Sequence, residues 1–386
     1  MAAITQAIAL FDGLGLFELP RIAFKKTFLA SKNMLNDDYS LTNCHFCSTV
    51  SLMVGEDPIG SAVPCDHWLI VELPQPWAKM LWQEHPILKP LLVLIKELFV
   101  KHGIKIQPIA IAPDREYSRP GYTRIFYYYR PQRLFNQFDK QEFIVPITLT
   151  LRLAKSILLQ LLNQPNELHS FIRYKQLSSH IREILTCTHG NVDIACARRG
   201  YPVYQKLRSD YAANSEGKLR VWRCSHFGGH QFAPTLVDLP QGHYWGHLQP
   251  EVLDNLIYRN SSFAQLYKHY RGWAGLSKFE QIAEREIFLS LGWEWLKYDK
   301  AGQLIVIDKD HECWAEVRIN CINIDAHVSQ AYKARVELSG YVITALNSGK
   351  NQPRQKVKQY RVSRLVELNK SGNDESITTR KEFGMS

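Results

Sequence analysis

Four residues in two neighbouring stretches of the chain have the types and spacing of a metal site. Cys187 and Cys196 stand in CTHGNVDIAC with eight residues between them, and His226 and His230 follow in CSHFGGH, about thirty residues later. Two thiolates and two imidazoles suit tetrahedral zinc. They equally suit a [2Fe–2S] cluster in which two histidines replace two of the usual cysteines on one iron. The residues alone therefore leave open a structural zinc module and an electron carrier.

The elements predicted around these residues bring them to one place. Glu183–Thr186 is a strand-like run that leads directly into Cys187, and Leu219–Arg223 is a strand-like run that ends at the histidine loop. Asp193 is a good N-cap for a helix that we expect to continue to about Ala213. The sequence thus predicts that the two thiols and the two imidazoles meet at adjacent strand ends.

Three further residues are candidates for contact with a bound group. Gly228 and Gly229 stand between the two histidines, where glycine permits positive φ and a close approach of the backbone. His189 lies two residues after Cys187, and it suits a residue beside the bound group as well as an ordinary turn histidine. We take Gly228, Gly229 and His189 as candidate cofactor-binding residues.

Apolar runs bounded by turn residues alternate with stretches of helical periodicity, which predicts an α/β protein. After the histidine loop, a hairpin at 235–248 and a helix at 251–258 complete a β-α-β-loop-β-β-α order, that of a thioredoxin-like module. A second α/β unit precedes it, with a buried strand at 68–73 and a helix at 149–162. From Trp293 onward, strand-like stretches with polar turns predict a small β-rich domain.

The predicted organisation therefore has four parts, and the N-terminal one resembles a thioredoxin-like unit only weakly. They are an N-terminal α/β domain at 1–165, a thioredoxin-like domain at 166–292, a β-rich domain at 293–369 and a disordered basic tail at 370–386.

Composition and charge narrow the class of protein. The chain has 386 residues with 45% hydrophobic and 22% charged residues, which is close to the globular average. Its most apolar stretch, 87–100, is interrupted by charged residues and a proline, so we expect no membrane span. The first residues lack the basic start of an export signal, and eight cysteines in such a chain favour metal or redox use over disulfides. These features predict a cytoplasmic protein.

The positive charge is concentrated at the C-terminal end. The formal net charge is +10, and residues 348–386 carry nine Lys or Arg against four Asp or Glu. Such a segment can attract nucleic acid, an anionic membrane or an acidic protein, although a solvated tail is the commoner case. The sequence has no nucleic-acid-binding motif, so nucleic acid is not an expected partner.

Several long stretches resemble the sucrase/ferredoxin-like family of thioredoxin-like ferredoxins. The resemblance lies in CTHGNVDIACARRGYPVY, VWRCSHFGGHQFAPTLVDLPQGHYWGHL, the N-terminal CSTVSLMVGEDPIGSAVPCDHWLIVELPQPWAKML and the downstream RGWAGLSKFEQIAERE, and it covers about residues 40 to 290. It implies a [2Fe–2S] cluster held by Cys187, Cys196, His226 and His230, with the cysteines on one iron and the histidines on the other.

Two positions depart from the family pattern. Many relatives have adjacent cysteines at the second ligand position, whereas this chain has Ala195 before Cys196, which points to Cys196 as the ligand. Relatives commonly have Arg where this chain has Val192, which puts a surface or partner contact in doubt. The sequence shows no carboxylate pair for glycoside hydrolysis and assigns no general acid or nucleophile, so catalysis is left open.

Other cysteines and histidines support alternative functions. Cys44 and Cys47 have the CxxC spacing of thiol–disulfide oxidoreductases, although the family resemblance extends to Cys47 alone. Cys65 and His67 nearby could complete a zinc site, but unligated thiols are the simpler interpretation. Cys224 could be a fourth zinc donor, and we favour a small core residue.

His243 and His247 have no loop that would make them converge, so we expect structural or surface roles for both. The resulting hypothesis is an electron carrier that exchanges electrons with a partner protein. The alternatives are a structural zinc protein with the same ligands and a thiol–disulfide oxidoreductase acting through Cys44 and Cys47.

Overall fold

The computed structural model describes residues 46–368 and 375–376, and most of it is built on one ten-stranded mixed sheet. The order across this sheet is β10-β9-β8-β6-β7-β2-β1-β3-β4-β5. Its strands are β1 (His67–Glu72), β2 (Ile106–Ile111), β3 (Tyr122–Tyr129), β4 (Asp139–Pro146), β5 (Lys175–Gln176), β6 (Arg182–Cys187), β7 (Leu219–Cys224), β8 (Leu236–Leu239), β9 (His243–Trp245) and β10 (Tyr270–Trp273).

The α-helices are α3 (Cys47–Met53), α4 (Leu81–Glu84), α5 (Leu88–His102), α6 (Thr150–Leu161), α7 (Ile194–Lys206), α8 (Leu253–Tyr258) and α9 (Lys278–Leu291). A π-helical turn, Leu207–Ala212, continues α7, and short 3-10 helices are η1 (Ile147–Leu149), η2 (Leu168–Tyr174), η4 (His230–Phe232), η5 (Pro250–Val252), η6 (Phe263–His269) and η7 (Gly292–Lys297).

The large sheet consists of two halves with the same topology. In the first half β1 is parallel to β2 and antiparallel to β3, which is antiparallel to β4. In the second half β6 is parallel to β7 and antiparallel to β8, which is antiparallel to β9. Each half therefore has the strand order of a thioredoxin-like unit, and the predicted α/β fold class is confirmed. The division at residue 165 stays a prediction, because both halves share one sheet.

The two halves meet between β2 and β7, where a single antiparallel residue pair joins Ile111 to Cys224. A buried ion network crosses from one half to the other. Arg220 on β7 donates to the Glu142 carboxylate on β4 at 2.6 Å and to the Glu183 carboxylate on β6 at 2.9 Å. Lys140 donates to Glu183 at 2.7 Å. Each of these buried charges has a partner, so removing any one of them would leave another charge buried and uncompensated.

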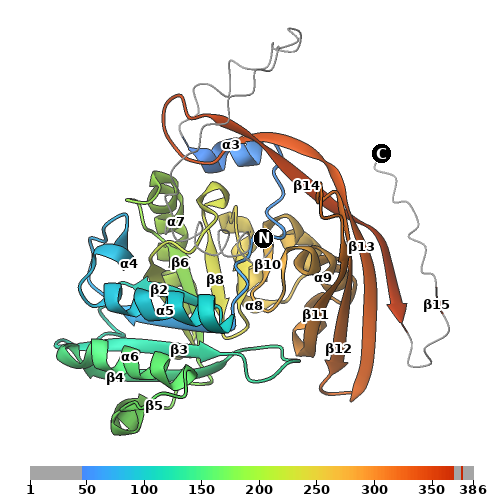
Figure 1. Cartoon of the computed structure of the whole chain (residues 1–386). Coiled ribbons are helices and arrows are strands. Elements are labelled where there is room, and N and C mark those ends of the chain that lie inside the picture. The colour runs from blue at the N-terminus through green and yellow to red at the C-terminus, as the bar shows by residue number, and fades with distance from the viewer. Residues whose placement is uncertain (1–45, 369–374, 377–386) are drawn as a thin grey trace.

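Side chains of successive strand residues point to opposite faces of the sheet. On β1, Leu69 and Val71 pack in the core under α5 and α6, whereas Trp68 and Ile70 face the core that continues into the second half. Figure 1 shows α5 and α6 side by side over this part of the sheet. Full burial of each such aliphatic side chain contributes about 1.5–3 kcal/mol. Because β1 has apolar side chains on both faces, both faces of the sheet must be covered, one of them by α5 and α6.

A separate antiparallel sheet follows the large one, as the predicted β-rich domain requires. Its strands, in order, are β11 (Tyr298–Ile307), β12 (Trp314–Asn323), β13 (Val328–Ala345), β14 (Arg354–Leu368) and β15 (Glu375–Ser376). Helix α9 lies between the two sheets and begins with a capping box formed by Ser277 and Glu280. Gln281, Glu284 and Arg285 are buried on α9, because the helix is covered from both sides.

The β13–β14 hairpin is longer than its neighbours and arches over the molecule to helix α3 (Figure 1). Ala345 at the end of β13 packs against Cys47 and Val50 of α3. Thr344 donates a hydrogen bond to the Glu56 carboxylate at 2.8 Å. Segments about 300 residues apart in the sequence thus form one lid on the second half of the large sheet.

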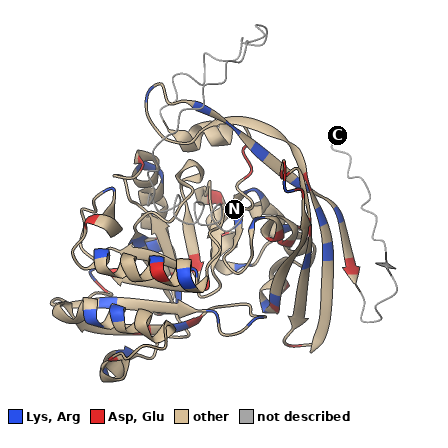
Figure 2. Ribbon diagram, in the orientation of Figure 1, with Lys and Arg blue, Asp and Glu red and all other residues tan. Residues whose placement is uncertain are grey.

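Part of the basic C-terminal segment is a strand. Figure 2 shows Lys and Arg along β13 and β14, and five basic residues of the 348–386 segment belong to β14: Arg354, Lys356, Lys358, Arg361 and Arg364. The tail predicted at 370–386 lies outside the described residues apart from β15. Within the described ranges, no helix combines the length and apolarity needed to cross a membrane.

Candidate metal centre

Three of the four predicted ligands converge at the carboxyl end of the second half's parallel strands. The donor atoms of Cys187, Cys196 and His226 all lie within 4.8 Å of one another, and all three residues are buried. His226 Nδ1 is 3.9 Å from Cys187 Sγ and 3.8 Å from Cys196 Sγ. We call this set the inner donor group. Its sulfur and imidazole donors are those that zinc and iron–sulfur clusters use.

Local sequence explains why the two thiols approach each other. Cys187 is the last residue of β6, and Cys196 lies in the first turn of α7. At Gly200 of α7, a Cβ atom would lie 2.1 Å from the Cys187 carbonyl oxygen, so only glycine lets the helix pack against this strand end. The pKa of the Cys196 thiol is raised, first by its hydrogen bond with Cys187 and then by burial. A bound metal ion would take the place of the thiol proton, so the Cys196 thiolate would have a positive partner at this buried position.

His189 positions the backbone of His226. Its Nδ1 accepts the His226 amide at 3.3 Å, while its Nε2 faces the carbonyl oxygens of Trp77 and Ala78 at 3.3 and 3.0 Å. These contacts assign the ring proton to Nε2, since carbonyl oxygens only accept. Burial lowers the pKa of His189, so the ring is neutral at physiological pH. His189 therefore links the histidine loop to the first half of the sheet.

The histidine loop has the backbone that its glycines predict. Gly228 and Gly229 have φ values of 95° and 76°, and the loop rests on the buried guanidinium of Arg271. Arg271 donates from Nη1 to the Gly228 carbonyl at 3.0 Å and from Nη2 to the Ser61 carbonyl at 2.9 Å. A Cβ atom at Gly229 would lie 2.2 Å from Arg271 Nη2. Sequence reasoning did not find Arg271, which lies about 40 residues beyond the loop.

The fourth predicted ligand, His230, lies next to the inner donor group but belongs to a second one. Its ring centroid is 5.4 Å from that of His226. Its Nδ1 lies 3.4 Å from both Cys47 Sγ and Asp193 Oδ2. Cys47 Sγ is 3.8 Å from Asp193 Oδ1. We call Cys47, Asp193 and His230 the outer donor group; their donor atoms also lie within 4.8 Å of one another.

Asp193 organises the outer donor group. It caps α7, as the sequence predicts, by accepting the Ala195 amide at 2.8 Å. It also accepts the Ser348 hydroxyl at 2.6 Å and the Ser348 amide at 2.8 Å, which fastens the tip of the β13–β14 hairpin to the site. Burial lowers the pKa of His230, and the Asp193 charge opposes this shift only in part. His230 is thus a neutral imidazole, the form that binds metals.

Cys47 is enclosed between α3 and the hairpin and is only 1% exposed. Its amide donates to Ser348 Oγ at 3.0 Å, and its sulfur lies 3.3 Å from the same oxygen. Burial, the largest effect, raises the pKa of the Cys47 thiol to about 12. Thiol–disulfide chemistry needs a thiol that is accessible and that ionises readily. Cys47 is buried and its pKa is raised, so it meets neither requirement. Cys44, the other residue of the CxxC, lies outside the described residues.

The remaining candidates occupy structural positions. Cys224 is fully buried opposite Cys187 in the β6–β7 register, which fits a core residue. His243 Nδ1 lies 2.8 Å from the Tyr270 hydroxyl, and His247 Nε2 lies 3.1 Å from Ser51 Oγ. Both histidines are buried, so neither is a surface residue. Among the described residues, Cys65, His67 and Cys224 belong to neither donor group.

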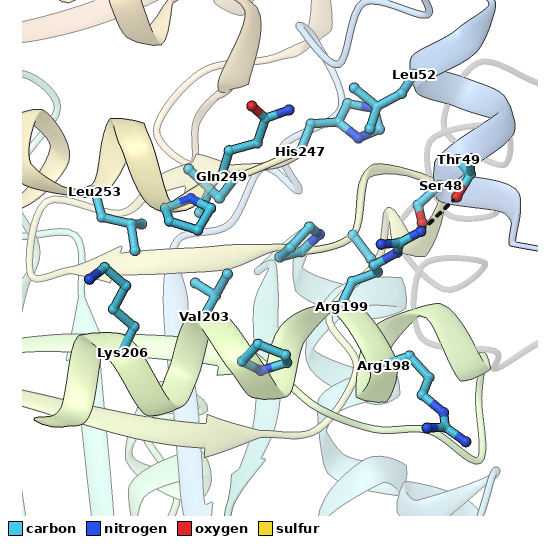
Figure 3. Close-up of a pocket in the computed structure, with 15 residues that line it drawn as sticks. Ser48, Thr49, Leu52, Arg198, Arg199, Val203, Lys206, His247, Gln249 and Leu253 are labelled. Carbon is cyan, nitrogen blue, oxygen red and sulfur yellow. Dashed lines mark hydrogen bonds between the residues drawn. The ribbon is translucent and has the colours of Figure 1, made fainter.

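A groove of about 330 Å³ lies beside the two donor groups, between α3 and α7 (Figure 3). Its apolar walls include Leu52, Val203 and Leu253, and Arg198, Arg199 and Lys206 of α7 line it as well. Arg199 points toward α3 and donates to Thr49 Oγ1 at 3.0 Å. The groove is therefore lined by both basic and apolar side chains.

Comparison with known proteins gives one match. The model of a family described as sucrase/ferredoxin-like matches residues 58–272, which is more than half of the chain. The matched range contains the inner donor group, His230 and Asp193, whereas Cys47 and Ser348 lie outside it. No curated protein and no solved structure matches the chain.

Proposed function

The chain belongs to the sucrase/ferredoxin-like family, and on that premise we propose that it is an electron carrier with a [2Fe–2S] cluster. Cys187, Cys196, His226 and His230 would hold the cluster, which supplies one-electron transfer when bound. The observation that carries this proposal is the inner donor group, two buried thiols and an imidazole in contact at two strand ends, with a second imidazole alongside.

A carboxylate beside His230 supports its assignment as a ligand. A metal-binding histidine usually donates its other ring N–H to a carboxylate or carbonyl oxygen, which fixes the ring and makes the bound nitrogen more basic. Asp193 Oδ2 lies 3.4 Å from His230 Nδ1 and can accept its proton. Nε2 is then the nitrogen available to iron. His189 serves the other histidine differently, by fixing the backbone at His226.

Arg271 supports a bound group that gains negative charge. Its hydrogen bonds go to neutral oxygens: the Gly228 and Ser61 carbonyls and the Ser61 hydroxyl. Burial lowers its pKa to about 10, and Cys187 and Cys196 are close enough to interact with it electrostatically. A guanidinium held in such a water-free position favours the reduced cluster over the oxidised one, because reduction adds one negative charge beside it.

The partner that we propose is a protein with an acidic docking surface. Around the outer donor group, α3 and α7 expose Leu52, Ile194 and Tyr201 next to Arg198 and Arg199. Small basic and apolar faces suit transient association steered by charge. We also propose a cytoplasmic location, since seven cysteines of the described part are free thiols, as a reducing compartment keeps them.

The docking face can be tested with inorganic oxidants of opposite charge. Replacing Arg198 and Arg199 with Glu should slow oxidation of the reduced protein by anionic ferricyanide at low salt and leave a cationic cobalt complex no slower. Arg152→Glu on α6, an exposed position, is the matched control and should change neither rate. Equal ferricyanide rates for the double variant and the control would contradict this docking face.

The cluster itself is tested by anaerobic purification and metal analysis. We expect equal amounts of iron and sulfide, a visible absorption spectrum and an EPR signal after reduction, all lost in Cys187→Ser. A structural zinc ion is the second candidate, because thiolates and imidazoles are zinc ligands and His226 Nδ1 lies within 3.9 Å of both sulfurs. A colourless protein with stoichiometric zinc, purified from iron-replete cells, would overturn the proposal in favour of that candidate.

A further inference from the structure

We infer that the outer donor group, Cys47, Asp193 and His230, is a second metal site that takes a divalent thiophilic cation such as Zn²⁺ before the cluster is loaded. The inference rests on the proposed function only where it treats His230 as a cluster ligand. The site itself follows from geometry at a place where three distant segments of the chain converge.

The donor separations match one tetrahedral ion. Ligand atoms about 2.0–2.3 Å from tetrahedral zinc lie about 3.3–3.8 Å from one another. The sulfur of Cys47 is 3.4 Å from His230 Nδ1 and 3.8 Å from Asp193 Oδ1. His230 Nδ1 is 3.4 Å from Asp193 Oδ2. Each pair of residues in the group thus has donor atoms close to this separation, with Asp193 Oδ1 facing Cys47 and Asp193 Oδ2 facing His230, and a thiolate, an imidazole and a carboxylate are all zinc ligands.

The surroundings hold the donors in place and leave a route for the ion. Cys47 and Asp193 are almost completely buried, and both hydrogen-bond to Ser348. The His230 side chain is 16% exposed, so a cation can reach the group from that side. When the ion binds, the Cys47 S–H bond breaks, a Zn–S bond forms and the proton passes to solvent.

One histidine then serves one metal at a time. With zinc on Nδ1, the neutral His230 ring keeps its proton on Nε2 and has no lone pair for iron. With iron on Nε2, the ring keeps its proton on Nδ1, and this N–H faces the Asp193 carboxylate. Zinc in the outer donor group and a complete cluster are therefore alternatives, and the first would delay loading of the second.

The test counts zinc on the full-length, metal-free, reduced chain, titrated against a chromophoric chelator. We expect two zinc ions per wild-type chain, one in each donor group, and one in Cys47→Ser. Cys321→Ser is the matched control, because Cys321 on β12 is a buried thiol outside both groups, and it should still bind two. The same zinc count in Cys47→Ser as in the wild type would overturn the site.

X-ray absorption of the zinc-loaded wild type gives a readout that does not depend on how a variant folds. The inner group contributes two thiolates and the outer group one, so we expect three zinc–sulfur bonds shared between two ions. Two bonds between two ions would exclude Cys47. Because both measurements use the metal-free chain, they test this site whether or not the cluster proposal holds.

The alternation is tested on the cluster-loaded protein. We expect that it takes up no zinc while its visible spectrum is intact. Uptake of one equivalent with an unchanged spectrum would overturn the claim that His230 serves one metal at a time.

Discussion

Replacing Gly229 with alanine tests how the histidine loop is supported. Gly229 has φ 76° and ψ 38°, a left-handed conformation that costs an L-residue about 1–2 kcal/mol. The new Cβ would also lie 2.2 Å from Arg271 Nη2 and 2.5 Å from its Cζ, so the guanidinium must move. Losing one of its buried hydrogen bonds costs about 1.5–3 kcal/mol. We therefore expect Gly229→Ala to lower the free energy of unfolding by about 2.5–5 kcal/mol.

Gly217 supplies a matched control for the backbone part of that cost. Its φ is 79°, nearly that of Gly229, but no atom lies within 4 Å of a Cβ built there. Gly217→Ala should cost only about 1–2 kcal/mol. Equilibrium urea unfolding of both metal-free variants measures the difference, which isolates the contact with Arg271. In an Arg271→Ala background, Gly229→Ala should cost no more than Gly217→Ala, because the clash is gone.

Equal costs for the two glycine variants in the wild-type background, within about 0.5 kcal/mol, would refute the reasoning. Such a result would mean that the loop can shift away from Arg271 without losing a hydrogen bond. The loop would then not be held rigidly, and its glycines would matter only for their φ values.

Three other predictions concern the sheet junction and the histidine loop. Arg220→Met should lower the free energy of unfolding by about 3–5 kcal/mol, because Glu142 and Glu183 remain buried without their main partner; a loss below 1 kcal/mol in denaturant unfolding would contradict this. Burial alone raises the pKa of Glu142, but the hydrogen bonds and charge of Arg220 bring that pKa below its usual 4.5. The stability that the Glu142–Arg220 pair contributes is therefore present above pH 4.5 and is lost as the pH falls below the lowered pKa. Unfolding curves between pH 3 and 6 should show this loss in the wild type and much less of it in Arg220→Met. His189→Ala removes the acceptor for the His226 amide and should weaken metal retention about 10–100-fold, measured as release to a chelator; unchanged release would argue against the positioning role.

The main strands of the large sheet could be predicted from the sequence because each is a short apolar run between turn residues. The runs at 68–73, 183–186 and 219–223 differ from β1, β6 and β7 by one or two residues at the ends. The helix expected from Asp193 to about Ala213 is present, but its last part is the π-helical turn Leu207–Ala212. Helical periodicity does not distinguish these two hydrogen-bond patterns.

Elements covered on both sides were harder to predict. β10 has only four residues, including Arg271 and Gly272, and was not predicted as a strand. Helix α4 spans only Leu81–Glu84, because the residues before it follow Pro74 and Pro76 in an irregular connection. Helix α9 buries Glu284 through hydrogen bonds from Trp295 and Tyr270. Because glutamate is usually exposed, its presence in the sequence of α9 indicates a solvent-facing position, whereas the structure buries it.

The same distinction applies to the metal centre. Cys187, Cys196 and His226 lie within 40 residues of each other, at ends of strands that the sequence predicts, so spacing could identify them. The outer donor group joins residues 146 positions apart, and Ser348 lies 301 positions from Cys47. Contacts of that range depend on how α3 and the β13–β14 hairpin pack, and no local pattern records such packing.

The lid formed by α3 and the tip of the β13–β14 hairpin determines when the site is closed during synthesis of the chain. All four proposed cluster ligands have been synthesised once residue 230 is added, but Ser348, which closes the site through Asp193 and Cys47, is added 118 residues later. At about 5–20 residues per second, this interval lasts roughly 6–24 s. During it the ligand loop exists without its cover, so the growing chain itself provides a period for metal delivery that ends once the hairpin tip has been made.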